Sequence, residues 1–554
     1  MNKVVSYQTC NGQQFKALVQ AATSWLENNH KRVNDLNVFP VPDGDTGTNM
    51  MLTMKNALKE ILGLDTDHVG QIVSKVAYGA VMGSRGNSGT ILSQIWSGLA
   101  DIVREEHVLD SPLLIRGLRR ATDKAYKGVQ HPVEGTILTV IREITEAVEA
   151  LPNHAIPLDK LLKIIVDVGW KSVQNTPELL PTLKQAKVVD SGGTGLMYIL
   201  EGMLRYMNRE SVAVEATNTF EAAIEALHTD NGVVEHPGEN FYDVQFIIKG
   251  QRLDAEIIKA DIERMGESAV VVATDTVVKV HVHVANPAEP IGYAIQHGQI
   301  TDVVIENMLE QYEAFVAQHE LATKSEPAAT NLIQPGDIAV IAVVPSTGFG
   351  DMFYDLQVTA LVNGGQTNNP SVEEFIRAFE SINTDKIILL PNNKNIILTA
   401  KQAAEMMPDR EIMVIPTRTV PQGISAMYPY QPKGDLHQIA QAMTAAKDSV
   451  VTAEITTAVR SVELDNVKVE EGQVIGLLDG QLTTVGDNEL EVAKSLLAQA
   501  DLEDRELLTV YFGADVSHEQ AAEFAEKLVE AYPNLEVEIA EGGQPHYPYI
   551  LSIE

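Results

Sequence analysis

The sequence predicts a multidomain protein: an all-helical N-terminal domain, then a small α+β domain, then an α/β C-terminal domain. Three observations support this fold class. Apolar residues recur at helical spacing through the first ~205 residues, strand and helix patterns mix after residue 239, and short apolar runs alternate with helical segments beyond residue 336. The chain has 554 residues, enough for several domains of about 100–200 residues each. We expect domains at 1–205, 239–322 and 337–554, with linkers at 206–238 and 323–336.

The N-terminal domain is predicted to be helical because its apolar residues repeat every three or four positions. The repeats cover residues 15–26, 52–61, 69–80 and 91–99. Gly-rich polar segments separate the helices, at 40–48, 83–89 and 191–195. Helices interrupted by such loops favour a helical bundle or barrel whose loops gather at one end.

The middle domain is predicted to have the order βαββα. Residues 241–250 alternate like a strand, and residues 252–265 have helical spacing. Two further strands are expected at 269–274 and 277–284, before a helix that begins near Glu289. The linker before this domain is acidic, ends in Pro-Gly and is expected to carry a short helix.

Four strand–helix alternations in the C-terminal domain predict a parallel, doubly wound sheet. We expect its strands at 338–344, 361–365, 386–391 and 411–416, and its helices to begin near Phe349, Val372, Asn395 and Leu436. Further strands are expected in the tail, at 457–464, 474–480, 507–513 and 535–542.

Charge and cysteine content exclude several classes of protein. The chain carries 76 acidic and 41 basic residues, a formal charge of −35, so it would repel nucleic acid. Cys10 is the only cysteine, which rules out an internal disulfide and a cysteine-based zinc site within one chain. We expect no signal peptide and no transmembrane segment, because no apolar run approaches the ~20 residues that span a bilayer. A cytoplasmic protein is therefore predicted.

The segment NVFPVPDGDTGTNM is a candidate metal site. Asp43 and Asp45 flank a glycine, and two prolines stiffen the chain before them. Carboxylates held so closely can aim at one point and suit Mg²⁺, which also binds phosphate oxygens of a nucleotide. Thr46, Thr48 and Asn49 offer caps for the next helix, whose amino end favours an anion. The alternative is an ordinary Pro/Asp/Gly turn between two helices.

Two glycine-rich segments at predicted helix junctions are candidate phosphate sites. They are GSRGNSGT at 83–90 and VDSGGTG at 189–195. Small residues let backbone N–H groups approach phosphate oxygens, and Ser, Thr and Asn side chains add donors. The first segment lacks the lysine of a Walker A motif, and a plain glycine linker between helices is the alternative for each.

These three segments resemble the signatures of the L-type dihydroxyacetone kinase domain (DhaL, DAK2). More narrowly, they resemble the variant found in the ATP-binding subunits of bacterial fatty acid kinases, and the likeness extends to VKVHVHVANP and GGQPHYPYILSIE further along the chain. The resemblance implies an antiparallel eight-helix barrel that binds ATP through two magnesium ions at one mouth.

The resemblance also implies which residues form the site. Asp43 and Asp45 match the metal-binding aspartates, and Asn37 stands near the place of a third aspartate in the dihydroxyacetone branch. The other expected contacts to the nucleotide lie in the three segments and at a further glycine turn: Thr46, Thr48, Asn49, Ser84, Asn87, Ser88, Gly89, Thr136, Asp190, Gly192 and Gly193.

The activity implied by this resemblance is phosphorylation of a fatty acid carboxylate by ATP, which gives an acyl phosphate for phospholipid synthesis. A separate fatty-acid-binding protein of the DegV-like fold would hold the substrate, and the C-terminal domain, which resembles part of that fold, would dock it. The family also suggests a homodimer. Two alternatives stay open: a component of a dihydroxyacetone (glycerone) kinase, and an ATP-responsive regulatory scaffold without turnover.

The middle domain contains a candidate metal site of its own. His281 and His283 alternate on a predicted strand, so both project from one face, and Asp243 on a neighbouring strand could be a third ligand. In the family that this region resembles, a cysteine often stands at the position of Asp243 and completes a Zn²⁺ site. The alternative is a pair of solvent-facing or interface histidines, which could still act in catalysis near the transferred group.

Overall fold

The computed structural model describes most of the chain and divides it into two compact units. Unit 1 combines residues 1–212 with 329–554, and unit 2 spans residues 213–328. The described residues are 7–37, 44–129, 131–210, 242–250, 253–273, 277–307, 333–366, 368–464, 467–503 and 505–554. Asp43 and most of both predicted linkers lie outside these ranges. Among the described helices, none combines the length and apolar character needed to cross a membrane.

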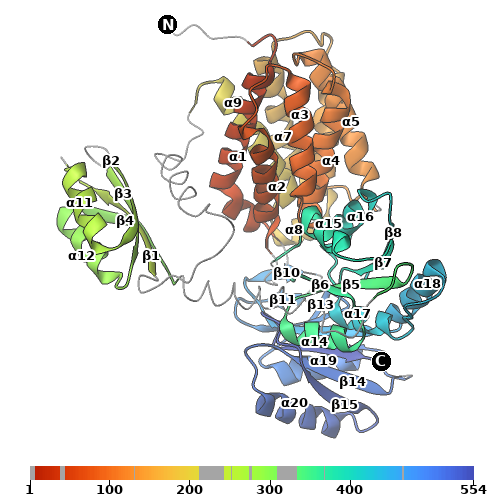
Figure 1. Cartoon of the computed structure of the whole chain (residues 1–554). Coiled ribbons are helices and arrows are strands. Elements are labelled where there is room, and N and C mark those ends of the chain that lie inside the picture. The colour runs from red at the N-terminus through yellow and green to blue at the C-terminus, as the bar shows by residue number, and fades with distance from the viewer. Residues whose placement is uncertain are drawn as a thin grey trace. The chain divides into compact units, whose positions relative to one another are not determined.

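The N-terminal part of unit 1 is a bundle of long helices (Figure 1), and their contacts close it into a ring. In the described residues of this domain, each long helix contacts the next, and α9 returns to α1 while the short α8 stays outside the ring. This confirms the predicted helical barrel. The helices are α1 (Gly12–Asn34), α2 (Thr46–Leu62), α3 (Val69–Met82), α4 (Gly86–Val103), α5 (Ser111–Lys127), α6 (Ile137–Glu149), α7 (Leu158–Leu179), α8 (Pro181–Ala186) and α9 (Ser191–Met207).

Local sequence explains both the ends and the packing of these helices. The side chains of Asn11 and Asp190 accept hydrogen bonds from the first turns of α1 and α9, as helix caps do. Apolar stripes then meet inside the ring, where Phe15 and Trp96 pack edge to face with ring centroids 6.4 Å apart. The core is otherwise aliphatic, which agrees with an aromatic content of 5%.

The C-terminal part of unit 1 begins with the predicted parallel sheet. Its strand order is β6-β5-β7-β8, and every neighbouring pair is parallel. Helices cover both faces, so the residues of β5 are buried throughout. The strands are β5 (Ile338–Val344), β6 (Ala360–Asn363), β7 (Lys386–Leu390) and β8 (Glu411–Val414), and the helices are α14 (Thr347–Asp355), α15 (Val372–Glu380), α16 (Ile397–Glu405), α17 (Val420–Met427) and α18 (Leu436–Lys447).

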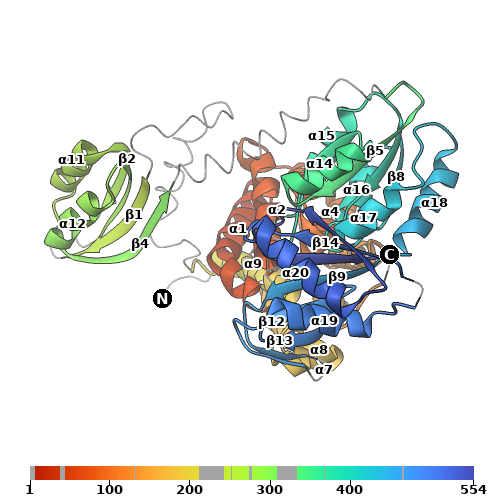
Figure 2. The same ribbon diagram turned by 90° about the horizontal axis from the view of Figure 1, so that it is seen from below.

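A second, mixed sheet follows and packs against the helices of the first. Its order is β13-β12-β9-β16-β14-β15, with only β14 and β15 parallel among its described pairs. Helices α19 and α20 cover its outer face (Figure 2), and the inner face meets α14 and α17. The elements are β9 (Val451–Thr457), β12 (Val474–Leu478), β13 (Gln481–Gly486), α19 (Glu489–Gln499), β14 (Leu507–Phe512), α20 (His518–Ala531), β15 (Glu536–Glu541) and β16 (Tyr549–Ile553).

One predicted strand of the tail is wrong in its bounds. We expected a strand at 457–464, but β9 ends at Thr457 and only β10 (Val462–Leu464) follows, paired in a hairpin with β11 (Val467–Val469). Between the two strands, Arg460 reaches the helical domain, where its guanidinium donates to the backbone oxygens of Asp35 and Asn37.

A buried polar junction joins the helical and C-terminal domains within unit 1. Helix α16 packs on α4, and in this junction the hydroxyls of Thr90 and Thr399 lie 3.0 Å apart. The amide of Gln402 donates to Ser93 Oγ at 3.1 Å and accepts from Ser84 Oγ at 3.4 Å. All five side chains are buried. The contact between α16 and α4 is therefore a specific interface held by buried hydrogen bonds.

Unit 2 is a four-stranded antiparallel sheet with helices on one face. Its order β2-β3-β1-β4 extends the predicted βαββα pattern by one strand, β4. The apolar face of the sheet packs on α11 and α12. The elements are β1 (Tyr242–Lys249), α11 (Ala255–Met265), β2 (Glu267–Ala273), β3 (Val277–Val284), α12 (Ala288–His297) and β4 (Gln299–Asn307).

Candidate functional site

A cavity of about 670 Å³ lies where the helical barrel meets the C-terminal domain. Its wall includes residues from the first turns of α2, α4, α6 and α9, together with the beginning of α16. The four barrel helices alternate around the ring, so their amino ends face the same way. Five helix amino ends therefore converge on one space.

This convergence gives the cavity a surface that suits an anion. The first N–H groups of a helix have no intrahelical acceptor, and the helix dipole places partial positive charge there. Glycine lets the backbone come close at the start of α4, where Gly86 has a φ of +57° and a Cβ would meet the Asn49 side chain at 2.8 Å. A phosphate group suits such a surface.

Asp45 is the described acidic residue of the predicted metal loop, and it lines the cavity. Its carboxylate accepts a hydrogen bond from the side-chain amide of Asn369, which belongs to the C-terminal domain. Asn369 is buried, and its Oδ1 has no hydrogen-bond partner among the described residues. A carboxylate beside an unsatisfied amide oxygen is the kind of donor set that Mg²⁺ prefers, so the residues present fit this ion.

Arg460 anchors the chain just before the metal loop. Its guanidinium donates to the backbone oxygen of Asp35 at 2.9 Å and also to that of Asn37. Gly44 lies beside the same guanidinium, since a Cβ there would be 3.5 Å from it. The C-terminal domain thus contacts the described residues on both sides of positions 38–43, through Arg460 at Asp35 and Asn37 and through Asn369 at Asp45.

The structure brings most of the predicted nucleotide residues together. Those that line the cavity are Asn37, Asp45, Thr46, Asn49, Asn87, Ser88, Thr136, Asp190 and Gly192. Four others lie outside its wall: Thr48, Ser84, Gly89 and Gly193. Ser84 is buried in the junction, where its hydroxyl donates to Val81 O and contacts Gln402. The amide of Gly193 donates to the carboxylate of Asp190, which thereby caps α9.

Asp190 combines this capping role with an altered ionisation. Burial raises the pKa of its carboxyl from 3.8 to about 6, although the hydrogen bonds from the backbone amides of Gly193 and Ile137 lower it. The carboxyl is therefore mostly ionised at pH 7 and becomes largely protonated only below about pH 6.

Sequence reasoning missed the basic residues of this site. Lys394, Lys401 and Arg418 line the cavity, and all three come from the C-terminal domain. They stand singly in the sequence rather than in a glycine-rich or charged motif. No motif in the sequence points to them: Lys401 lies on the helix predicted from Asn395, and Lys394 and Arg418 lie outside the predicted helices and strands.

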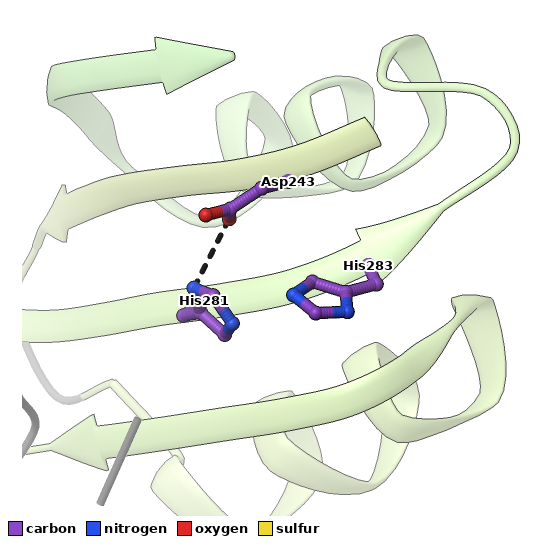
Figure 3. A group of neighbouring side chains, drawn as sticks. All are labelled: Asp243, His281 and His283. Atoms are coloured by element: carbon purple, nitrogen blue, oxygen red, sulfur yellow. Dashed lines mark ion pairs between the residues drawn. The ribbon is translucent and has the colours of Figure 1, made fainter. Parts of the chain in front are cut away.

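The predicted ligands of the middle domain come together in unit 2, as Figure 3 shows. Asp243 lies on β1, and His281 and His283 lie side by side on β3. The Oδ1 of Asp243 is 3.0 Å from His281 Nδ1, and one ligand atom from each of the three residues falls within 4.8 Å of the others. His281 is fully buried, and the other two side chains are half-buried.

The chemistry of this trio suits a transition metal. Burial alone would raise the pKa of Asp243, but the hydrogen bond and charge of His281, with smaller contributions from Gln245 and His283, hold it below its ordinary value. The carboxylate is then ionised and able to bind a cation at neutral pH. Two imidazoles and one carboxylate form a common protein ligand set for zinc.

Comparisons with known proteins cover all three domains. The family model described as "DAK2 domain" matches residues 40–205, and models for the middle and C-terminal domains of FakA-like fatty acid kinase proteins match residues 239–315 and 339–554. Protein YloV of Bacillus subtilis is 35% identical, over 99% of this chain and 100% of its own. An uncharacterized protein of Staphylococcus haemolyticus is 34% identical, over 98% of this chain and 99% of its own. A solved DegV family protein from Corynebacterium glutamicum is 14% identical with a TM-score of 0.31, over 39% of this chain and 96% of that one.

Proposed function

The chain belongs to the FakA-like fatty acid kinase family, and from this premise we propose that it binds Mg-ATP and phosphorylates a fatty acid carboxylate to give an acyl phosphate. The observation that carries the proposal is the convergence of helix amino ends on the cavity that contains Asp45. A polyphosphate is the ligand whose charge and size suit that convergence.

Different residues of the cavity would have different roles in phosphoryl transfer. Asp43 and Asp45 would hold two magnesium ions, which supply charge neutralisation at the phosphate oxygens when bound. Ser88 and Asn87 begin α4 and would orient the phosphates, while Thr136, Asp190 and Gly192 lie where the ribose and base would bind.

The reaction asks little covalent chemistry of the protein. An oxygen of the fatty acid carboxylate attacks the γ-phosphorus in line, a new P–O bond forms, and the bond to the β-phosphate oxygen breaks with its electron pair leaving on ADP. A carboxylate is already a nucleophile, so no general base is needed. The site must instead overcome the repulsion between the carboxylate and the triphosphate, and it does so by electrostatic stabilisation and positioning.

A separate protein would present the acyl chain. The cavity wall carries polar residues beside apolar ones such as Ile91, Ile137 and Leu398, and a protein that holds the acyl chain would deliver its carboxylate to the polar part. We propose a fatty-acid-binding partner of the DegV-like fold that docks on the C-terminal domain, and a homodimeric assembly of this chain in the cytoplasm.

We further propose that Asp243, His281 and His283 bind a zinc-type ion within the middle domain. The distances among their ligand atoms support three protein ligands, which leaves a position for water or another group. The ion would stabilise the small unit, because a ligand that binds only the folded state favours that state.

The test is acyl phosphate formation by the full-length chain. Purified protein, a DegV-like fatty-acid-binding protein loaded with a fatty acid, and Mg-ATP should release ADP and an acyl phosphate that hydroxylamine traps as a hydroxamate. Asp43→Ala and Asp45→Ala should each lower the rate by about a hundredfold or more, because each removes a metal ligand from the transferring phosphate.

The controls separate the alternative functions. Asp123→Asn changes an exposed aspartate on α5 that lies outside the cavity, and its rate should match wild type. Phosphorylation of free dihydroxyacetone instead of the fatty acid would assign the chain to the glycerone kinases. Nucleotide binding without any turnover on either acceptor would favour the regulatory scaffold.

A further inference from the structure

We propose that the C-terminal domain completes the nucleotide site and that Lys394, Lys401 and Arg418 bind the polyphosphate of the nucleotide. This inference rests on the proposed function for the presence of a nucleotide, and it adds a second domain to the binding site.

The first support is the distribution of charge around the cavity. The helical domain contributes two aspartates to the wall, Asp45 and Asp190, and among its described residues it contributes no lysine or arginine. Every described lysine or arginine of the wall comes from the C-terminal domain. In a chain with a formal charge of −35, three cations that line the same cavity as two carboxylates indicate a place for added negative charge.

The second support is the packing of α16 against α4. Thr399 and Gln402 are three residues apart and form one face, which is bound to α4 through the buried hydroxyls of Thr90 and Ser93. The neighbouring face carries Lys401 together with Ile397 and Leu398 at helical spacing, and these line the cavity. Because the first face is fixed, the second has a defined position at the mouth of the barrel.

The amino end of α16 adds positive electrostatic potential to the same cavity wall. Lys394 precedes the helix, and Ile396 at the N-cap position has no side chain that could accept from the first turn. The wall includes Asn395 and the first helical residues, so backbone N–H groups and two lysines face one space. Lysine supplies a mobile point charge, and the guanidinium of Arg418 can form paired hydrogen bonds to phosphate oxygens.

The distribution of the lining residues between the two domains suits a nucleotide that spans the junction between the barrel and the C-terminal domain. Asp190, Thr136 and Gly192 lie on the barrel side, where the ribose and base would bind. The three cations belong to the C-terminal domain, which also holds Asp45 through Asn369. A polyphosphate therefore links the two domains, and a nucleoside monophosphate would reach the cations with one phosphate at most.

The test measures nucleotide affinity in the full-length protein, without a partner protein. Isothermal calorimetry with Mg-ATP and with AMP is carried out on wild type, Lys394→Gln, Lys401→Gln and Arg418→Gln. Each substitution should weaken Mg-ATP binding by about tenfold, the size expected for losing a charge-assisted hydrogen bond, and change AMP binding by less than about twofold. Lys401→Arg should keep most of the affinity because it keeps the charge.

Matched controls come from the same domain. Lys433→Gln and Arg377→Gln remove exposed cations that lie outside the cavity wall, and both should bind Mg-ATP like wild type. Thermal unfolding of every variant checks that the fold is kept, since all three test residues are at the surface of the cavity rather than in the core.

The outcomes distinguish this inference from the proposed function. A loss of Mg-ATP affinity no larger than in the controls overturns the inference, and so does an equal loss for AMP. A wild-type chain that binds no Mg-ATP overturns both proposals. The expected affinity changes in a protein that forms no acyl phosphate support the two-domain nucleotide site and overturn only the phosphoryl transfer.

Discussion

At the scale of single residues, Asp190 links the stability of the helical domain to pH. Its pKa is about 6 in the folded protein against 3.8 ordinarily, so between these values the folded state holds a proton that the unfolded state has released. The free energy of unfolding contributed by this group therefore falls as pH rises from about 4 to about 6, by up to about 1.4 kcal/mol per pH unit.

Asp190→Asn isolates this effect, because an asparagine oxygen can still accept from the amide of Gly193 and cap α9. The variant should be about as stable as wild type near pH 4 and more stable near pH 7. Urea unfolding of the full-length protein without nucleotide, at several pH values, measures the difference. If the free energies of unfolding of the two proteins changed in parallel with pH, the carboxyl of Asp190 would have the same pKa in the folded and unfolded states.

How well residues of the site could be predicted depended on whether they stand in motifs. Asp45, Ser88 and Asp190 lie in glycine-rich segments at helix starts, where backbone geometry restricts the sequence. Lys401 and Arg418 stand alone, and only the packing of α16 on α4 brings them to the cavity. A long-range contact of this kind leaves no local periodicity, so sequence reasoning placed these residues in a domain for partner docking.

At the scale of elements, hydrophobic periodicity predicted the strongly amphipathic and fully apolar segments and missed the weak ones. The barrel helices and the buried strand Ile338–Val344 follow their patterns closely. Strand β4 was missed because Val303, Val304 and Ile305 are all exposed and do not alternate. Helix α17 was missed because its eight residues include a proline and a glycine, which favour a turn locally.

The junction between α4 and α16 allows a prediction about the stability of unit 1. Gln402→Ala removes the partner that Ser84 and Ser93 have across the interface and leaves a small void. We expect the free energy of unfolding to drop by about 1–3 kcal/mol, the cost of unsatisfied buried polar groups. Binding of Mg-ATP should weaken as well, because α16 then holds Lys401 less firmly.

Glu405→Ala is the matched control for this change. Glu405 is on the same helix but exposed, and its helix propensity is close to that of glutamine. Its effect on stability should stay within about 0.5 kcal/mol. Equal effects of the two substitutions in urea unfolding would mean that the hydrogen bonds of Gln402 contribute no net stability to the interface.

At the scale of the whole molecule, the chain order does not follow the structural units. Residues 1–212 and 329–554 form one unit although unit 2 is inserted between them in sequence. The buried junction and the shared cavity join the two halves of unit 1, and unit 2 has a separate apolar core around Phe246. Sequence patterns predicted three successive domains, because they carry no information about which domains share an interface.

This organisation predicts two unfolding transitions with different ligands. In the proposed function Mg-ATP binds only folded unit 1, so a concentration of 100 times Kd should stabilise that unit by about 2.7 kcal/mol and raise only its midpoint. A zinc-type ion bound by Asp243, His281 and His283 should raise only the midpoint of unit 2, and a chelator or His281→Ala should lower it.

Differential scanning calorimetry of the full-length protein resolves the two unfolding transitions. The control is His437→Ala, which changes an exposed histidine of unit 1 and should alter neither the response to Mg-ATP nor the response to the metal ion. A single transition that shifts with both nucleotide and metal would mean that the two units unfold as one, and the insertion would then be a structural part of the kinase rather than an independently stabilised domain.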